Sequence, residues 1–185
     1  MAKIAIVYHS GFGHTKVLAE AVAKGAASIA GTTVDLVPVA EAEAKVETLN
    51  AADAIIFGSP TYMGSVSGPF KTWADTTAKV WFAQGWKDKL AAGFTNSSGP
   101  SGDKYATISA MWTLAMQHSM IWVSQGVMVG TKQGDVTLNR LSSWGGVMAT
   151  SENAAPGENN PSKDDQASGF GLGARVATLA KKLKG

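Results

Sequence analysis

Short apolar runs and longer amphipathic segments alternate along this chain. An apolar run without polar alternation is typical of a strand covered on both faces, and an apolar position every three or four residues is typical of a helix. The runs predict five strands, at residues 3–8, 32–39, 53–60, 90–98 and 122–130. The amphipathic segments predict four main helices, at residues 15–30, 68–81, 104–120 and 167–184.

Two of these helices show clear apolar faces. The first carries Leu18, Ala19, Val22, Ala26 and Ile29 on one side, and the second carries Phe70, Trp73, Ala74 and Thr77. Strands that alternate with helices predict a parallel sheet with helices on both faces. With five strands we expect an α/β flavodoxin-like three-layer sandwich of strand order 2-1-3-4-5, with its ligand beyond the carboxyl ends of strands 1 and 3.

Length and composition favour one globular domain over residues 1–185. The polar stretch 150–166, with its two prolines, predicts a surface loop before the last helix. No apolar run approaches the roughly 18 residues of a membrane span, and the first residues lack the features of a secretory signal. We therefore expect a cytoplasmic protein.

Charge and cysteine content exclude several classes of function. The sequence contains no cysteine, which rules out disulfides, thiolate chemistry and cysteine-ligated iron–sulfur clusters. The formal net charge is +2, and four cations lie in the closing segment, namely Arg175, Lys181, Lys182 and Lys184. Because no basic and aromatic stripe is present, nucleic-acid binding is not expected.

The first strand leads into its helix through "YHSGFGHT", residues 8–15. A strand-to-helix turn presents unpaired N–H groups at the positive end of a helix, and this turn adds hydroxyls, an imidazole and glycines. It has neither the lysine of the P-loop nor the third glycine of GxGxxG, so a mononucleotide phosphate fits it better than a nucleoside triphosphate. A plain turn with Ser10 or Thr15 as the helix cap explains the same residues equally well.

Two further loops follow strands that end at the same edge of the sheet. "GSPTYMGSVSGPF" follows the third strand and has a polar and aromatic tip, and "TNSSGPSGDK" follows the fourth. Their backbone amides suit the edges of a planar ring whose phosphate lies in the first loop. Taken singly, the second loop could be a turn in which Tyr62 and Met63 pack on a neighbour, and the third an ordinary polar loop.

Together the three loops resemble those of the flavodoxin-like family, and more closely its NAD(P)H:quinone oxidoreductase branch, the tryptophan-repressor-binding-protein type. The resemblance rests on "YHSGFGHT", "IIFGSPTYMGSVSGPFKTWAD" and "SSGPSGDKYATISAMWTLAMQHSM", and extends to about Met120. It implies FMN as cofactor, with the phosphate held by Ser10, Phe12, Gly13, His14 and Thr15. It implies that the flavin ring is lined by Pro60, Thr61, Tyr62, Met63, Gly64 and Ser65, and on its other edge by Asn96, Ser97, Ser98, Gly99, Gly102 and Asp103.

The resemblance also implies two residues near the reactive face of the ring. His118 would approach that face as the catalytic group, although a cap at the end of its helix explains it equally well. Trp81 would complete the pocket of a neighbouring subunit, so we expect a homodimer or homotetramer. Phe12, Tyr62 and Trp81 would offer flat surfaces to substrates.

The chain departs from that branch at two positions. Tyr62 stands where arginine is frequent, so the choice between NADH and NADPH is not predicted. Asp103 stands where glycine is usual, and would add negative charge if it pointed inward.

His9, His14 and His118 are not spaced as the ligands of a metal would be, so we predict no metal site. Trp144 could be a lid or could pack under a loop.

The resemblance implies an enzyme that transfers two electrons from NAD(P)H to a quinone by a ping-pong hydride mechanism. Three alternatives stay open: a flavodoxin-type one-electron carrier, an NAD(P)H-dependent FMN reductase that releases its product, and a regulatory module that the flavin only stabilises. Carriers are usually strongly acidic, and the isoelectric point near 8.8 argues against that alternative.

Overall fold

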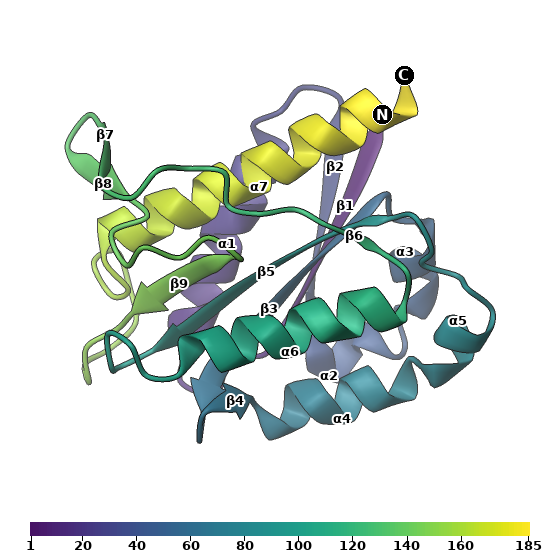
Figure 1. The fold of residues 1–185 in the computed structure, drawn as a ribbon, viewed down its shortest axis with the longest axis horizontal. Helices are drawn as coiled ribbons and strands as arrows, with labels where there is room; N and C mark the ends of the chain where they lie inside the picture. Colours follow the sequence, from purple (N-terminus) through teal and green to yellow (C-terminus); the bar gives the residue numbers. More distant parts are fainter.

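A parallel sheet lies between two layers of helices in a computed structural model that describes residues 1–185 (Figure 1). The strands of the sheet are β1 (Ala2–Tyr8), β2 (Thr32–Pro38), β3 (Ala54–Tyr62), β5 (Leu90–Ser97), β6 (Ile121–Trp122) and β9 (Val147–Thr150). The strand order β2-β1-β3-β5-β6 confirms the predicted flavodoxin-like arrangement, because the short β4 (Ser65–Val66) only pairs antiparallel with the end of β3.

Helices connect these strands in the order that the apolar spacing predicts. They are α1 (His14–Ala27), α2 (Val39–Ala42), α3 (Val46–Ala51), α4 (Gly68–Thr76), α5 (Ala78–Phe82), α6 (Lys104–Gln117) and α7 (Lys163–Lys184). The single helix expected over residues 68–81 is two helices, since the backbone leaves helical geometry at Thr77. The short α2 and α3 were not predicted. None of the seven helices combines the length and the apolar character that a membrane span requires.

The fifth strand differs from the prediction of residues 122–130. It consists of two short pieces: β6 pairs with the start of β5, and β9 pairs with the end of β5. Between them, residues 123–146 leave the sheet and include the hairpin of β7 (Thr131–Gln133) and β8 (Val136–Leu138). The apolar residues Met128 and Val129, which made this stretch look like a strand, are exposed.

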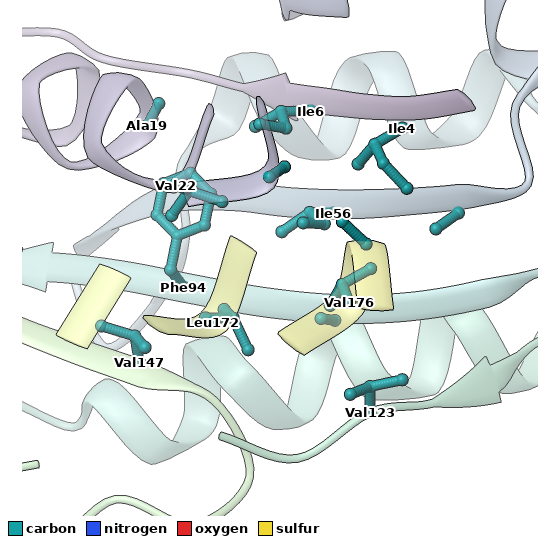
Figure 2. Close-up of a cluster of buried hydrophobic side chains, with 14 of the residues drawn as sticks. Ile4, Ile6, Ala19, Val22, Ile56, Phe94, Val123, Val147, Leu172 and Val176 are labelled. Carbon is teal, nitrogen blue, oxygen red and sulfur yellow. The ribbon is translucent and has the colours of Figure 1, made fainter. Parts of the chain in front are cut away.

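The sheet is buried on both faces, as the absence of polar alternation predicts. In β1, Ile4 and Ile6 face a core formed with α1 and α7, whereas Ala5 and Val7 face a second core formed with α2 to α6. Figure 2 shows the first core, in which Phe94 of β5 lies among side chains from both helices and the sheet. The predicted apolar faces of α1 and α4 are buried in these cores.

Helices α1 and α7 approach so closely that glycine is required at their contact. A Cβ atom built on Gly173 would lie 1.9 Å from the carbonyl oxygen of Val22, and one on Gly25 would lie 1.9 Å from that of Phe170. Real Cβ atoms do not approach backbone that closely, so neither site can take a larger residue without moving a helix. This contact fixes the second half of α1 against α7.

We expect Gly173→Ala to lower the free energy of unfolding by about 2–4 kcal/mol, because the new methyl must push α7 away from α1. Gly171→Ala is the matched control, since a Cβ at Gly171 meets nothing within 4 Å. The control should stabilise the protein by about 0.5–1 kcal/mol through helix propensity. Urea unfolding measures both variants, and equal effects would contradict the close approach.

Candidate functional site

A cavity of about 230 Å³ lies at the carboxyl edge of the sheet, where the predicted loops meet. The first loop contributes Phe12, His14 and Thr15, the second Pro60, Thr61 and Tyr62, and the third Asn96, Ser97 and Ser98. A fourth segment, Ser151 to Asn153, completes the lining. The structure therefore brings together predicted residues from all three loops and adds one segment that the sequence analysis missed.

The first loop presents unpaired backbone donors. Gly13 has φ of +92° and directly precedes α1, and as a glycine it has no side chain that could cap the helix. The N–H groups of Gly13, His14 and Thr15 donate no hydrogen bond to any protein acceptor. The first turn of α1 contains no acidic residue. These free donors and the positive end of α1 form a site suited to an anion.

The side chains of Ser10, His14 and Thr15 in this loop make different contacts. Ser10 caps the helix, because its Oγ accepts the N–H of Lys16 at 3.1 Å, as the alternative interpretation of the loop expected. His14 donates from Nε2 to the carbonyl oxygen of Ala154 at 2.8 Å, so its side chain secures the fourth segment. Thr15 is buried, lines the cavity and makes no side-chain hydrogen bond within the protein. Of the two hydroxyls in this set, that of Thr15 is therefore free to bind a ligand.

The second loop places an aromatic ring against the first. Tyr62 is 36% exposed, and its ring lies edge-on to Phe12 with centroids 6.2 Å apart. A Cβ on Gly11 would lie only 2.6 Å from the Tyr62 hydroxyl. Burial raises the pKa of Tyr62, and the Gly11 N–H acts in the opposite direction, so the hydroxyl stays protonated at neutral pH. Met63 at the tip of the loop is fully exposed.

Thr61 lines the cavity, but its hydroxyl is hydrogen-bonded to two buried residues of the protein interior. Its Oγ1 lies 2.8 Å from that of Thr95 and 2.7 Å from that of Thr107, and all three residues are buried. This hydroxyl cluster joins β3, β5 and α6 directly beneath the site. Thr61 therefore has its backbone, and not its hydroxyl, available to a ligand.

The third loop is held from two sides. Asn96 accepts from the Ser151 hydroxyl at 2.8 Å, which ties the loop to the fourth segment. Lys104 lies beneath the loop and donates from Nζ to the carbonyl oxygens of Gly99 and Pro100. Asp103 is exposed and has φ of +54°, a left-handed conformation that glycine adopts more readily than aspartate.

The remaining predicted residues lie around the cavity without lining it. Ser10 and Gly13 border a second hollow of about the same volume. Outside the lining set are Met63, Gly64, Ser65, Gly99, Gly102 and Asp103. A Cβ on Gly64 would lie 3.9 Å from Cβ of Asp103, so the second and third loops meet at this point.

The fourth segment, residues 151–160, folds over the start of α1. The side chain of Asn160 donates to the carbonyl oxygens of Glu152, Ala154 and Ala155 and accepts the N–H of Glu152. A Cβ on Gly13 would lie 2.7 Å from Cγ of Pro156. The prediction of a surface loop missed this contact because it placed the last strand at 122–130. A strand at 147–150 would have put the loop at the carboxyl edge.

His118 does not lie at the cavity, contrary to the prediction from the resemblance. It is 2% exposed at the C-terminal end of α6, and its Nε2 lies 2.9 Å from Oγ1 of Thr77. Its ring packs on Trp86 with centroids 4.4 Å apart. A helix of 14 residues is about 20 Å long, and the cavity is at the other end of α6. Burial lowers the pKa of His118 to about 4, so it is neutral at physiological pH.

The tryptophans divide between core and surface. Trp73 is buried, as its place on the predicted apolar face of its helix indicates, whereas Trp112 is 47% exposed. Trp81, predicted to reach a neighbouring subunit, is 44% exposed on α5. Trp144 is 51% exposed and does not line the cavity.

Comparison with known proteins places the chain among flavoproteins. Residues 3–134 match the family described as NADPH-dependent FMN reductase. Flavodoxin FldP from Pseudomonas aeruginosa is 39% identical, and an NAD(P)H dehydrogenase (quinone) from Trichlorobacter lovleyi is 31% identical. Each alignment covers 99% of this chain and 99% of the relative.

Solved structures agree with this assignment. The flavodoxin, WrbA-like protein from Agrobacterium tumefaciens is 39% identical, has a TM-score of 0.78, and is matched over 98% of this chain and 99% of its own. The Trp repressor binding protein from Bacillus subtilis, at 17% identity and a TM-score of 0.62, shares the fold over 94% of this chain and 96% of its own.

We expect Gly13→Ala to weaken FMN binding at least about tenfold, because the methyl group would strain the left-handed turn and displace Pro156. Gly134→Ala is the control: Gly134 also has positive φ, at +57°, but a Cβ there meets nothing within 4 Å. Both variants should lose about 1–2 kcal/mol of stability, and only Gly13→Ala should change the dissociation constant measured by flavin fluorescence. Unchanged affinity in Gly13→Ala would contradict the role of this turn.

Because His118 is buried in its neutral form, the free energy of unfolding should depend on pH below 6.5. Its folded-state pKa of about 4 lies below the ordinary value of 6.5, so the unfolded chain binds the proton more readily between these values. As the pH falls from 6.5 to 4, wild type should lose up to about 3 kcal/mol of unfolding free energy relative to His118→Gln. Urea titrations across this range measure the difference. Parallel pH profiles for the two proteins would show that His118 is not buried in its neutral form.

Proposed function

Because the chain belongs to the flavodoxin-like NADPH-dependent FMN reductase family, in its tryptophan-repressor-binding-protein branch, we propose that it binds FMN at the four-segment cavity and transfers two electrons from NAD(P)H to a quinone. The observation that carries the proposal is the set of free N–H donors at the start of α1, which opens into a cavity lined by the second and third loops.

The residues at this edge fit FMN. The N–H groups of Gly13, His14 and Thr15 and the Thr15 hydroxyl would hold the phosphate, a role that needs no lysine or metal. The absence of side chains at Gly11 and Gly13 leaves the loop in contact with Tyr62 and Pro156, with no room for a Cβ. The fourth segment would close over the phosphate side.

The ring would lie between the second and third loops. Pro60, Thr61 and Tyr62 would border one side, and the backbone of residues 96–98 would meet the other edge with its amide and carbonyl groups. When bound, FMN supplies the chemistry of hydride acceptance and two-electron donation. The protein binds and orients the planar substrates, and Phe12 at 76% exposure and Tyr62 at 36% offer them flat apolar surfaces.

Proton supply does not involve His118 in this proposal. His118 is neutral, buried and bonded to Thr77 at the other end of α6. Tyr62 is one of three titratable side chains that line the cavity, with His14 and Glu152, and its raised pKa keeps its hydroxyl a hydrogen-bond donor. It would orient a substrate carbonyl or quinone oxygen by a hydrogen bond.

A one-electron carrier is the second candidate, and one observation favours it: the relative of 39% identity is named a flavodoxin. The isoelectric point near 8.8 and net charge of +2 oppose it, because acidic faces are the usual means by which such carriers meet their partners. An FMN reductase that releases reduced FMN would need loose binding of the flavin.

Assembly and location belong to the same proposal. Trp81 at 44% exposure and Phe82 at 85% form an aromatic surface on α5, which would suit a neighbouring subunit in a homodimer or homotetramer. A cytoplasmic setting would supply both the nicotinamide donor and a quinone.

The test is an anaerobic absorbance titration of the FMN-reconstituted protein with NADH or NADPH, followed by benzoquinone. We expect direct loss of the oxidised flavin absorbance without a long-wavelength band, and full recovery on addition of quinone. Protein-free FMN at the same concentration is the control for uncatalysed reaction. No reaction with either nicotinamide, together with a long-wavelength band on stepwise chemical reduction, would instead support the electron carrier.

A further inference from the structure

Lys104 is a fully buried lysine at the start of α6, directly beneath the third loop. Its exposed fraction is 0%, which is unusual for lysine. Its Nζ donates to the carbonyl oxygens of Gly99 and Pro100. Both acceptors belong to the segment between the cavity residue Ser98 and α6, so the side chain fastens this segment from below.

No carboxylate neutralises this ammonium group by direct contact, and Lys104 takes part in no salt bridge. Asp165 is the acidic group that raises the pKa of Lys104, but it accepts hydrogen bonds from the guanidinium of Arg140, with Nε to Oδ1 at 2.8 Å and Nη2 to Oδ2 at 2.5 Å. It also accepts the N–H of Thr150 at 2.9 Å. Arg140 opposes the effect of Asp165 on the pKa of Lys104, although Asp165 is the larger of the two influences. Counted as two cations and one carboxylate, the three side chains have an excess of one positive charge under the loop.

A buried charge without a counterion is costly unless hydrogen bonds or a ligand compensate it. Desolvation lowers the pKa of Lys104 to about 8, with smaller opposite effects of Asp165 and Arg140, so the group still carries its charge at neutral pH. Two carbonyl oxygens satisfy two of its three donors but supply no net charge. The missing negative charge points to a ligand above the loop.

We propose that Lys104 is a positioning residue that holds the third loop in its binding shape and places a fixed positive charge beneath it, so that reduced FMN, which is more anionic, binds more tightly than oxidised FMN. The inference rests on the proposed function, because it takes FMN as the ligand. It goes beyond that function by assigning the preference between redox states to a residue outside the cavity lining.

Redox-state preference separates this role from simple loop support. If Lys104 only ordered the loop, its loss would weaken oxidised and reduced FMN alike. If its charge acts on the flavin, its loss must weaken the reduced form more, since reduction adds negative charge. The preference is expressed as a ratio, the dissociation constant of oxidised FMN divided by that of reduced FMN. This ratio follows from the difference between the midpoint potentials of bound and free FMN.

The experiment measures this ratio by spectroelectrochemistry in wild type, Lys104→Gln, Lys104→Met and Lys104→Arg. Lys104→Gln keeps N–H donors for the two carbonyls and removes the charge, so the ratio should fall about tenfold with little change in oxidised FMN affinity, the size that a unit charge exerts through partly solvated protein. Lys104→Met should weaken the binding of both oxidised and reduced FMN, and should lower the ratio by as much as Lys104→Gln does. Lys104→Arg should keep the wild-type ratio.

Lys89→Met is the matched control. Lys89 also donates from Nζ to two backbone carbonyls, those of Asn50 at 2.8 Å and Ala52 at 2.5 Å, but it precedes β5 at the opposite edge of the sheet. Its loss should lower thermal stability and leave the ratio unchanged. Amide exchange of residues 97–103 in the FMN-free protein should quicken in Lys104→Met and not in Lys89→Met.

The possible failures are distinguishable. If wild type binds no FMN, the proposed function fails and the proposed role of Lys104 fails with it. If wild type binds FMN and the ratio in Lys104→Gln stays within twofold of wild type, the role of the charge is overturned while the proposed function stands. Should Lys104→Met not fold, Lys104→Gln and Lys104→Arg make the same comparison.

Discussion

Burial of the central strands on both faces is the constraint on which the rest of the structure depends. Because β1, β3 and β5 have helices on either side, the buried polar side chains of β3 and β5 lie near the carboxyl ends of these strands. The glycine contact between α1 and α7 fixes the second half of α1, and the turn at Gly13 leaves the N–H donors at the start of this helix unpaired. One apolar arrangement thus positions the anion site.

The sequence predicts this part of the structure well because the signals are local. Apolar runs define β1, β3 and β5, and each is followed by small or polar residues that become a loop of the cavity. The fifth strand could not be found in this way. Its two pieces, β6 and β9, are short and lie on either side of residues 123–146, so only pairing with β5 identifies them. The role of residues 151–160 was lost with that strand.

The error over His118 has a similar cause. The resemblance matched its position along the chain, but helix length decides its place in space, and α6 carries it to the opposite edge of the sheet. Sequence spacing also does not show which hydroxyl is committed inward, as Thr61 is, or which lysine is buried. These properties arise from tertiary contacts, which single-sequence patterns do not contain.

The electrostatics of the carboxyl edge bear on the choice between reductase and carrier. Helices α1, α4 and α6 all begin at this edge, and none has an acidic residue in its first turn, although Asp103 directly precedes α6 and Glu152 lines the cavity. Lys104 adds a buried cation there, whereas the acidic first turn of α7 is engaged by Arg140 through Asp165. Positive potential favours a phosphate and also a reduced, anionic flavin. A carrier that must avoid full reduction needs the opposite field, which is one reason for proposing two-electron transfer.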